Sequence, residues 1–516
     1  MAKAKKDSAT RFLKSLEYLG NLLPHPVSLF FLMAVGVVLF SGLAEWWGLR
    51  VPNPEEPGSD IVAISLLSAD GFRRILTGLV RNFVNFAPLG TVLVAMLGVG
   101  IAEISGLFSS LIRAIVLLAP RQLMTSALVF AGVISNTASE MGYVVLVPMA
   151  GFVFLALGRH PLAGMAAAFA GVSGGYSANL FIGTIDPLLS GITEEAARML
   201  QPEIEVNALA NWYFMFASTF LVTGVGTWVT HRFVEPTLGT YNEKFAEKAG
   251  VNSQEFLKPL TSREKLGLIC ACASLVVMIF LLVLTIVPEG GVLRNPETGS
   301  RLNSPLLSGV VALIFVFFLI PSTIFGMITG TIKSDRDIID GMAASMSKLG
   351  LYLVLVFFAA QFVSFFAWTN LGQILAVVGA DFLIWLRLDN PLVFLPFILI
   401  CGFVNLMLGS ASAQWALTAP IFVPMLMRLN FSPELIQAAY RIGDSCTNII
   451  TPMMSYFGLI LAFAARFDRR IGIGTIVSMM LPYSVAFLLS WIAFFYLWVF
   501  VLNLPVGIGT QTYLQP

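Results

Sequence analysis

The chain has 516 residues, of which 57% are hydrophobic and only 11% are charged, and its mean hydropathy is +0.85. Soluble domains carry roughly 25% charged residues, so the composition predicts an all-α polytopic membrane protein. The net charge of +1 says nothing about nucleic acid by itself, but there is no basic stripe, and no nucleic-acid partner is expected. Four scattered Cys and three scattered His form no recognised metal or redox motif.

A membrane-spanning helix needs about 20 consecutive apolar residues, and such segments recur along the chain. A basic N-terminal arm precedes the first span and lacks the pattern of a cleavable signal. An amphipathic stretch around Arg73 and Arg81 leads into the second span. Residues 106–120 and 371–386 are too short for a full crossing and are predicted to be interfacial. The uninterrupted spans are predicted at about 26–46, 86–104, 208–230, 266–287, 305–324, 349–368 and 476–501.

Two apolar segments have polar centres where a membrane helix would carry Leu, Ile and Val. Residues 123–157 contain the sequence SNTAS at 135–139, and residues 391–427 contain GSASAQW at 409–415. The first is too long for one span, and non-helical backbone at that depth must be buried in protein or line a wet cavity. Both segments are therefore predicted to be re-entrant hairpins that enter and leave on the same side.

Each hairpin is followed by a predicted broken span. The first, 161–192, is expected to break at residues 174–179, and the second, 433–467, at residues 443–448. The spacings agree: Pro161 to Pro433 is 272 positions, and Asn179 to Asn448 is 269. Interrupted polar segments at matching places in two halves are typical of a transporter binding site.

The distribution of Lys and Arg predicts the topology. With nine crossings and two hairpins, the basic loops near Lys333 and Arg466 lie inside, together with the N-terminus, and the C-terminus lies outside. The two repeats are then inverted and the hairpin tips meet near the midplane. The division predicted is an N-terminal half (1–232), a cytoplasmic linker (233–265) and a C-terminal half (266–516).

Three motifs resemble one family of membrane transporters. They are GGYSANLFIGTIDP at 174–187, SASAQWALTAPIFVPM at 410–425 and RIGDSCTNIITPMMSYFG at 441–458. The chain resembles the p-aminobenzoyl-glutamate transporter (AbgT) family, within a broader ion-transporter superfamily, over nearly its whole length. The resemblance implies an inner-membrane homodimer that imports p-aminobenzoyl-glutamate or exports sulfonamide antimetabolites.

Ionisable and aromatic residues at the polar breaks are the candidate substrate site. Asp186 lies inside a broken span, where carboxylates are usually functional. Arg441 and Asp444 share one helical face. Arg441 is expected to bind a substrate carboxylate, while Asp444 either holds Arg441 or takes the coupling proton. A purely structural ion pair is the alternative. Trp415 is expected to stack on an aromatic substrate, with packing as the alternative, and Ser412 to donate a hydrogen bond to it. The resemblance adds Pro452, which otherwise only kinks its helix.

The coupling ion is expected to be H⁺ or Na⁺. Asp186 is the candidate proton acceptor, because it has no cation nearby in the sequence. Oxygen atoms at helix breaks suit Na⁺, and Asn179 with Asn448 is the candidate metal site, although these side chains would also satisfy broken backbone. No other cofactor is expected. The oxygen donors are Asn136, Thr137, Asn179, Asn448 and Thr451.

The leading function is therefore secondary active transport by alternating access of a small aromatic, carboxylate-bearing substrate. A membrane-embedded hydrolase would need a nucleophile–base pair, and no His lies near the polar turns. An ion channel and a dicarboxylate/Na⁺ symporter of the same superfamily are further alternatives. No Walker A pattern is present, so ATP is not expected to drive transport. The sequence leaves open import against export, and H⁺ against Na⁺.

Overall fold

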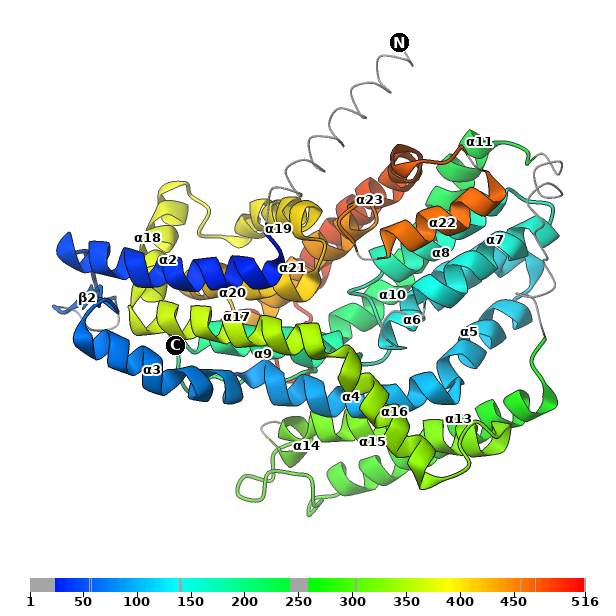
Figure 1. Ribbon diagram of the computed structural model, residues 1–516, viewed down its shortest axis with the longest axis horizontal. Coiled ribbons are helices and arrows are strands. Elements are labelled where there is room, and N and C mark those ends of the chain that lie inside the picture. Colours follow the sequence, from blue (N-terminus) through cyan, green and yellow to red (C-terminus); the bar gives the residue numbers. More distant parts are fainter. Residues whose placement is uncertain are drawn as a thin grey trace, which may run out of the picture.

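The computed structural model is mostly helical, as the sequence predicts (Figure 1). It describes residues 24–54, 56, 58–138, 142–241, 259–301, 304–454, 456–468 and 470–514. A short antiparallel hairpin, β1 (Arg50–Pro52) with β2 (Asp60–Val62), was not predicted. It buries Val51 against Ile61, which are register partners, while the flanking residues stay exposed. Three-residue strands are too short to give a clear alternation in a sequence.

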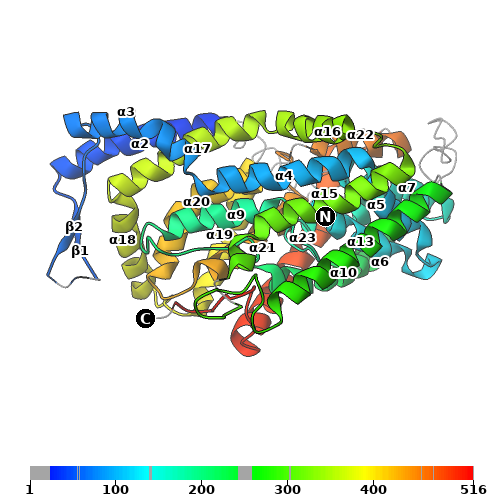
Figure 2. The same cartoon turned by 90° about the horizontal axis from the view of Figure 1, so that it is seen from below.

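The scaffold consists of two groups of helices, and each group packs around one central helix. Helix α4 (Ala87–Ser105) packs against α15 (Val310–Thr329) and α16 (Asp335–Lys348). Helix α17 (Gly350–Trp368) packs against α2 (Pro26–Trp46) and α3 (Ala69–Val84). Figure 2 shows α2, α3 and α17 along one edge of the molecule. Helix α13 (Ser262–Ile286) lies outside α15 and buries only Gly267 and Ala271.

The order of elements that begins with α4 is repeated from α17 onward. A scaffold helix, a short helix, a hairpin, a broken span and a final long helix follow one another in both halves. The short helices are α5 (Leu107–Leu118) and α18 (Leu371–Trp385), close to the two segments predicted to be interfacial. The final helices are α10 (Trp212–Val229), extended by η5 (Thr230–Val234) and α11 (Glu235–Leu238), and α23 (Ile473–Tyr496), extended by η7 (Leu497–Val501).

The hairpins are two helix–turn–helix units with polar tips. In the first, η1 (Arg121–Leu123), α6 (Met124–Ser135) and η2 (Asn136–Ala138) lead to the tip, and η3 (Gly142–Leu146) with α7 (Val147–Ala156) leads away. Helix α6 turns back from α5 by 117°. In the second, η6 (Pro391–Val393) and α19 (Phe394–Leu408) meet α20 (Ala411–Met427) at Gly409, whose φ of 61° a non-glycine residue would rarely adopt.

The broken spans contain short helices separated by irregular backbone. The first consists of α8 (Pro161–Phe169), η4 (Ala170–Gly174) and α9 (Ile185–Ala197), with no helix over 175–184, as predicted. The second consists of α21 (Pro433–Asn448) and α22 (Phe457–Phe467).

The break predicted at residues 443–448 is wrong, because α21 continues to Asn448 and the irregular backbone covers residues 449–454 and 456 among those described. Gly443 allows α21 to approach α19, since a Cβ atom there would overlap the Ile398 carbonyl. Pro452, which has no N–H to donate, lies in the break itself.

In the part of the chain that the structure describes, eight helices are long and apolar enough to cross a membrane, or nine if the bent α5–α6 pair counts as one span. Seven of them coincide with predicted crossings, and the eighth is the first arm of the second hairpin. The two broken spans are missed by a length criterion because each is divided. A short α14 (Pro305–Ser308) precedes α15. The predicted linker begins at residue 233, inside a helical stretch that ends at Leu238, and residues 242–258 lie outside the described residues.

Candidate substrate and ion site

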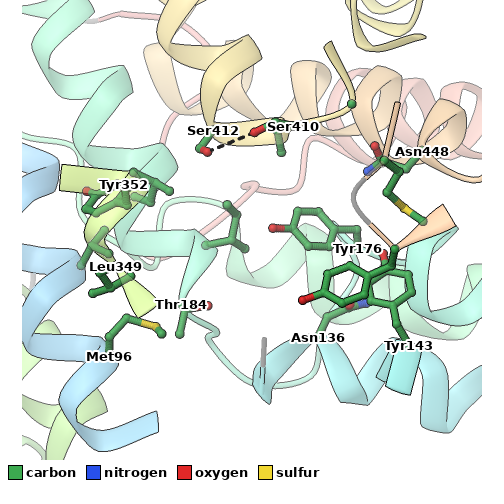
Figure 3. Close-up of a pocket in the computed structure, with 17 residues that line it drawn as sticks. Met96, Asn136, Tyr143, Tyr176, Thr184, Leu349, Tyr352, Ser410, Ser412 and Asn448 are labelled. Carbon is green, nitrogen blue, oxygen red and sulfur yellow. Dashed lines mark hydrogen bonds between the residues drawn. The ribbon is translucent and has the colours of Figure 1, made fainter. Parts of the chain in front are cut away.

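A chamber of about 280 Å³ lies where both hairpin tips meet both helix breaks and the scaffold. Figure 3 shows Asn136 of the first tip on one side and Ser410 and Ser412 of the second tip on another. Scaffold residues, Met96 of α4 and Tyr352 of α17, close a further side. The remaining lining residues are Val92, Tyr143, Tyr176, Thr184, Ile185, Leu188, Leu349, Gly409, Ala411, Asn448, Met454 and Tyr456.

The two repeats make the same contact between hairpin tip and broken span. Asn136 Nδ2 donates to the Gly175 carbonyl at 3.1 Å, and Asn405 Nδ2 donates to the Asp444 carbonyl at 2.8 Å. Asn405 lies 269 positions after Asn136, and Asp444 lies 269 positions after Gly175, the same offset as from Asn179 to Asn448. Sequence reasoning missed Asn405, although applying that offset to Asn136 would have found it.

A second set of contacts fixes the side-chain amides of the breaks. Thr137 Oγ1 donates to Asn179 Oδ1 at 2.9 Å in the first repeat. In the second, Asn405 Nδ2 also lies 2.8 Å from Asn448 Oδ1. The first break is joined to α21 of the second broken span, because the Ser177 backbone N–H donates to Ser445 Oγ at 3.0 Å. The predicted oxygen donors therefore lie in two clusters, one in each repeat.

Arg441 pairs with Asp186 and not with Asp444, which corrects the expectation from the sequence. An Arg441 guanidinium nitrogen contacts Asp186 Oδ1 across the α21–α9 interface, and both side chains are about 3% exposed. Asp186 Oδ2 accepts from the Gly183 backbone N–H at 2.7 Å. Position i+3 on a helix allowed an Arg441–Asp444 pair, but only the packing of two distant helices could show the pair that forms. The expectation that Asp186 is free to take up a proton depended on the absence of a cation nearby in the sequence, and Arg441 supplies a cation from a distant helix.

Asp444 is a fully buried carboxylate with unfilled hydrogen-bonding capacity. Asn448 Nδ2 donates to its Oδ2 at 3.4 Å, while Oδ1 has no hydrogen-bond partner among the described residues. The same is true of the Oδ1 atom of Asn405, which is also fully buried. Buried oxygens without donors are costly, so these two oxygen atoms are candidates to bind a cation or, at Asp444, a proton.

Trp415 is fully buried and does not line the chamber. Its ring stacks on Tyr440 with centroids 4.2 Å apart, and its Nε1 donates to Thr193 Oγ1 at 2.8 Å. Thr193 in turn donates to Gln437 Oε1 at 2.6 Å. In this conformation the indole joins α20 to α9 and α21, so its stacking on a substrate stays a prediction that requires this packing to open.

The other predicted residues are divided between the chamber and the supporting structure. Ser412, Asn136 and Asn448 line the chamber. Thr451 donates to the Leu406 carbonyl at 2.9 Å and so links the break to the hairpin arm. Pro452 lies in the irregular segment, away from the lining.

A chamber between two repeats, each with a re-entrant hairpin and a broken helix, defines a membrane transporter rather than an enzyme. The model of the AbgT putative transporter family matches residues 11–514, and the chain belongs to this family. It is 35% identical over 494 residues to the p-aminobenzoyl-glutamate transport protein of Escherichia coli strain K12, covering 96% of this chain and 95% of that protein.

Two solved structures have the same fold. MtrF of Neisseria gonorrhoeae, described within a class of antimetabolite efflux pumps, is 54% identical with a TM-score of 0.91, over 97% of this chain and 100% of that one. The YdaH transporter of Alcanivorax borkumensis, described as having an unusual topology, is 41% identical with a TM-score of 0.87, over 94% of this chain and 100% of that one. The predicted fold class is therefore confirmed.

Proposed function

We propose that this protein is a secondary active transporter of p-aminobenzoyl-type aromatic compounds, in the first place an exporter of sulfonamide-like antimetabolites. The observation that carries the proposal is the chamber. The hairpins and broken spans of both repeats, which together we call the core, enclose it on one side, and scaffold helices enclose it on the other. Export is favoured over import of p-aminobenzoyl-glutamate because identity to the efflux protein, at 54%, exceeds that to the glutamate-conjugate transporter, at 35%.

The way that the core is held together supports alternating access. The hairpins and broken spans are cross-linked by the Asp186–Arg441 pair, by Ser177 with Ser445 and by Trp415 with Thr193. The scaffold face of the chamber is largely apolar, with Val92, Met96 and Leu349. An apolar contact has no directional bonds to break. The core can therefore slide as one body against this face of the scaffold and carry the chamber to either side, once the hydrogen bond from Ala87 N to Glu195 Oε1 between α4 and α9 opens.

The coupling site proposed is the oxygen cluster of the second repeat. Asp444, Asn405 and Asn448 would hold Na⁺ through their side-chain oxygens, or Asp444 would carry the coupling proton. The first repeat has Gly175 at the position of Asp444, so its donors Asn136, Thr137 and Asn179 bring no charge to balance a cation. We place the protein in the inner membrane as a homodimer, with the N-terminus in the cytoplasm and the C-terminus outside.

The direct test is transport in proteoliposomes that contain the full chain. A labelled sulfonamide and labelled p-aminobenzoyl-glutamate would be offered in turn, with imposed H⁺ and Na⁺ gradients. The proposal expects one gradient to drive the sulfonamide against its concentration. If neither ion gradient moves either compound faster than protein-free liposomes, the proposal is wrong.

A further inference from the structure

The first turn of α4 has no side-chain cap from its own segment. Phe86, which precedes the helix, has no side-chain acceptor, and Pro88 has no N–H to donate. The first N–H groups of a helix have no partner inside it, and that of Ala87 donates to Glu195 Oε1 at 3.2 Å. Glu195 lies on α9, 108 positions farther along the chain. A helix of the core therefore caps a helix of the scaffold, and the partial positive charge of a helix N-terminus favours a carboxylate there.

Glu195 lies at the end of a line of contact that begins at the chamber. Leu188 of α9 and Val92 of α4 both line the chamber. One turn farther along α9, Gly191 lies so close to Pro88 that a Cβ atom at position 191 would be 3.0 Å from the proline ring. Residues 188, 191 and 195 are three and four positions apart, so they share one face of α9. We call this contact the α4–α9 seam, and Figures 1 and 2 both show the two helices beside each other.

The neighbouring carboxylate, Glu194, has a different role. It accepts a hydrogen bond from the Val206 backbone N–H at 3.0 Å and pairs with Arg198 at 2.9 Å. Both glutamates are half-buried, so they differ in their partners more than in their exposure. Glu194 fixes the loop that follows α9, whereas Glu195 joins the core to the scaffold.

We propose that Glu195 is a latch, whose bond to Ala87 holds the α4–α9 seam closed in this conformation and opens each time that the core moves to the other side. The inference rests on the proposed transport function and assigns Glu195 a place in the alternating-access cycle. With the N-terminus in the cytoplasm, as proposed, the first broken span ends on the outer side, so the closed seam separates the chamber from the outside. A hydrogen bond to a charged group shifts a two-state equilibrium by about tenfold, which favours one state without preventing the other. Glu195 is not among the residues that line the chamber, so it is a positioning residue.

The first test asks whether the seam opens during transport. Ala87→Cys and Glu195→Cys would be combined in the full chain and joined by a short, reducible bifunctional thiol reagent. The proposal expects transport of a labelled sulfonamide in proteoliposomes to stop when the two positions are joined and to return on reduction. Each single variant, treated in the same way, controls for the four native cysteines. Undiminished transport by the joined protein would show that the seam stays closed throughout, which would overturn the proposal.

The second test measures the balance between the two states. Half-saturating concentrations of a labelled sulfonamide would be determined in right-side-out and in inverted membrane vesicles, which expose the outer and inner faces of the protein. The apparent affinity on each face is proportional to the fraction of protein open to that face. Glu195→Ala should therefore raise the apparent affinity on the outer face and lower it on the inner face, and change their ratio at least about threefold. Glu195→Gln, which keeps an acceptor without the charge, should change the ratio less and in the same direction.

The neighbouring glutamate distinguishes a latch from a general structural effect. Glu194→Ala should leave the ratio of the two affinities unchanged, and thermal unfolding would verify that each variant is folded. A loss of stability alone would lower transport from both faces equally. An unchanged ratio in Glu195→Ala, or an equal change in Glu194→Ala, would overturn the latch alone. A wild type that transports no sulfonamide in either kind of vesicle would overturn the proposed function as well.

Discussion

The two repeats share a skeleton and differ in charge. Asn136 on Gly175 and Asn405 on Asp444 make the same hydrogen bond in the two halves, yet only the second half has a carboxylate at this place. In the first half, the buried carboxylate Asp186 lies after the break, in the first turn of α9, and Arg441 of the second half neutralises it. The shared contacts build the fold, and the departures from symmetry supply the charges available for coupling.

The largest expected effect comes from breaking the charge pair that joins the repeats. Arg441→Met would leave Asp186 as a buried carboxylate without its cation, which costs about 3–5 kcal/mol. The double variant Asp186→Asn/Arg441→Met should recover much of that loss while remaining inactive in transport. Thermal unfolding of the single and double variants measures both. An Arg441→Met protein as stable as wild type would show that the pair does not join the repeats.

The Asp186–Arg441 pair also allows the shape of the cation at position 441 to be tested separately from its charge. Arg441→Lys keeps the positive charge but presents it as a point and not as a planar fork, so transport should fall nearly as far as in Arg441→Met, with a smaller loss of stability. Initial transport rates in proteoliposomes test this. Full activity of the Lys variant would mean that any cation at position 441 suffices.

The next largest effect concerns stabilisation by Na⁺, and it distinguishes the oxygen cluster of the second repeat from that of the first. If the second repeat holds Na⁺, added Na⁺ should raise the unfolding temperature of the wild type, since ligands that bind only the folded state stabilise it. Asp444→Asn should abolish that rise, whereas Asn136→Ala, at the matching tip of the first repeat, should keep it. A Na⁺-induced rise that persists in Asp444→Asn, or that is lost in Asn136→Ala, would place the ion in the first repeat. If Na⁺ has no effect on the wild type, Asp444 is left as a proton site.

A smaller effect is expected at Trp415. Trp415→Phe removes the indole N–H from Thr193 but keeps a ring against Tyr440, so stability should fall by about 1 kcal/mol. Affinity for an aromatic ligand should change less than twofold if Trp415 packs as the structure shows. Calorimetric binding to Trp415→Phe and Trp415→Ala decides the point. A loss of more than tenfold in Trp415→Ala, together with near-normal affinity in Trp415→Phe, would instead restore the predicted stacking on substrate.

The smallest effect is expected at the second hairpin tip. Ser412 lies 269 positions after Tyr143, so equivalent positions of both hairpins line the chamber. Ser412→Ala removes one neutral hydrogen bond to a ligand, and affinity should fall about threefold. Titration of a sulfonamide measures this loss. No loss would mean that the ligand does not contact the second hairpin tip.

Local sequence patterns predicted the helices, the hairpins and the repeat, because hydropathy and Pro, Gly and Asn positions act over a few turns. These patterns failed where the packing of segments far apart in the sequence determines which residues are in contact. Gly443 was interpreted as a break, but it provides close packing between α21 and α19. Arg441 was paired with its neighbour on the helix, but it reaches Asp186, 255 positions away. The stacked rings of Tyr143 and Tyr456 join a hairpin to the opposite break, and no local pattern marks such a contact.

The most direct test of the central claim, that the carboxylate specific to the second repeat couples transport to an ion, is a comparison of two fluxes in Asp444→Asn proteoliposomes. Gradient-driven accumulation of a labelled sulfonamide should be lost, because the variant cannot change its charge with ion binding. Exchange of labelled for unlabelled sulfonamide, which needs no net ion movement, should continue. Accumulation by Asp444→Asn that equals that of wild type under the same imposed gradient would contradict the claim.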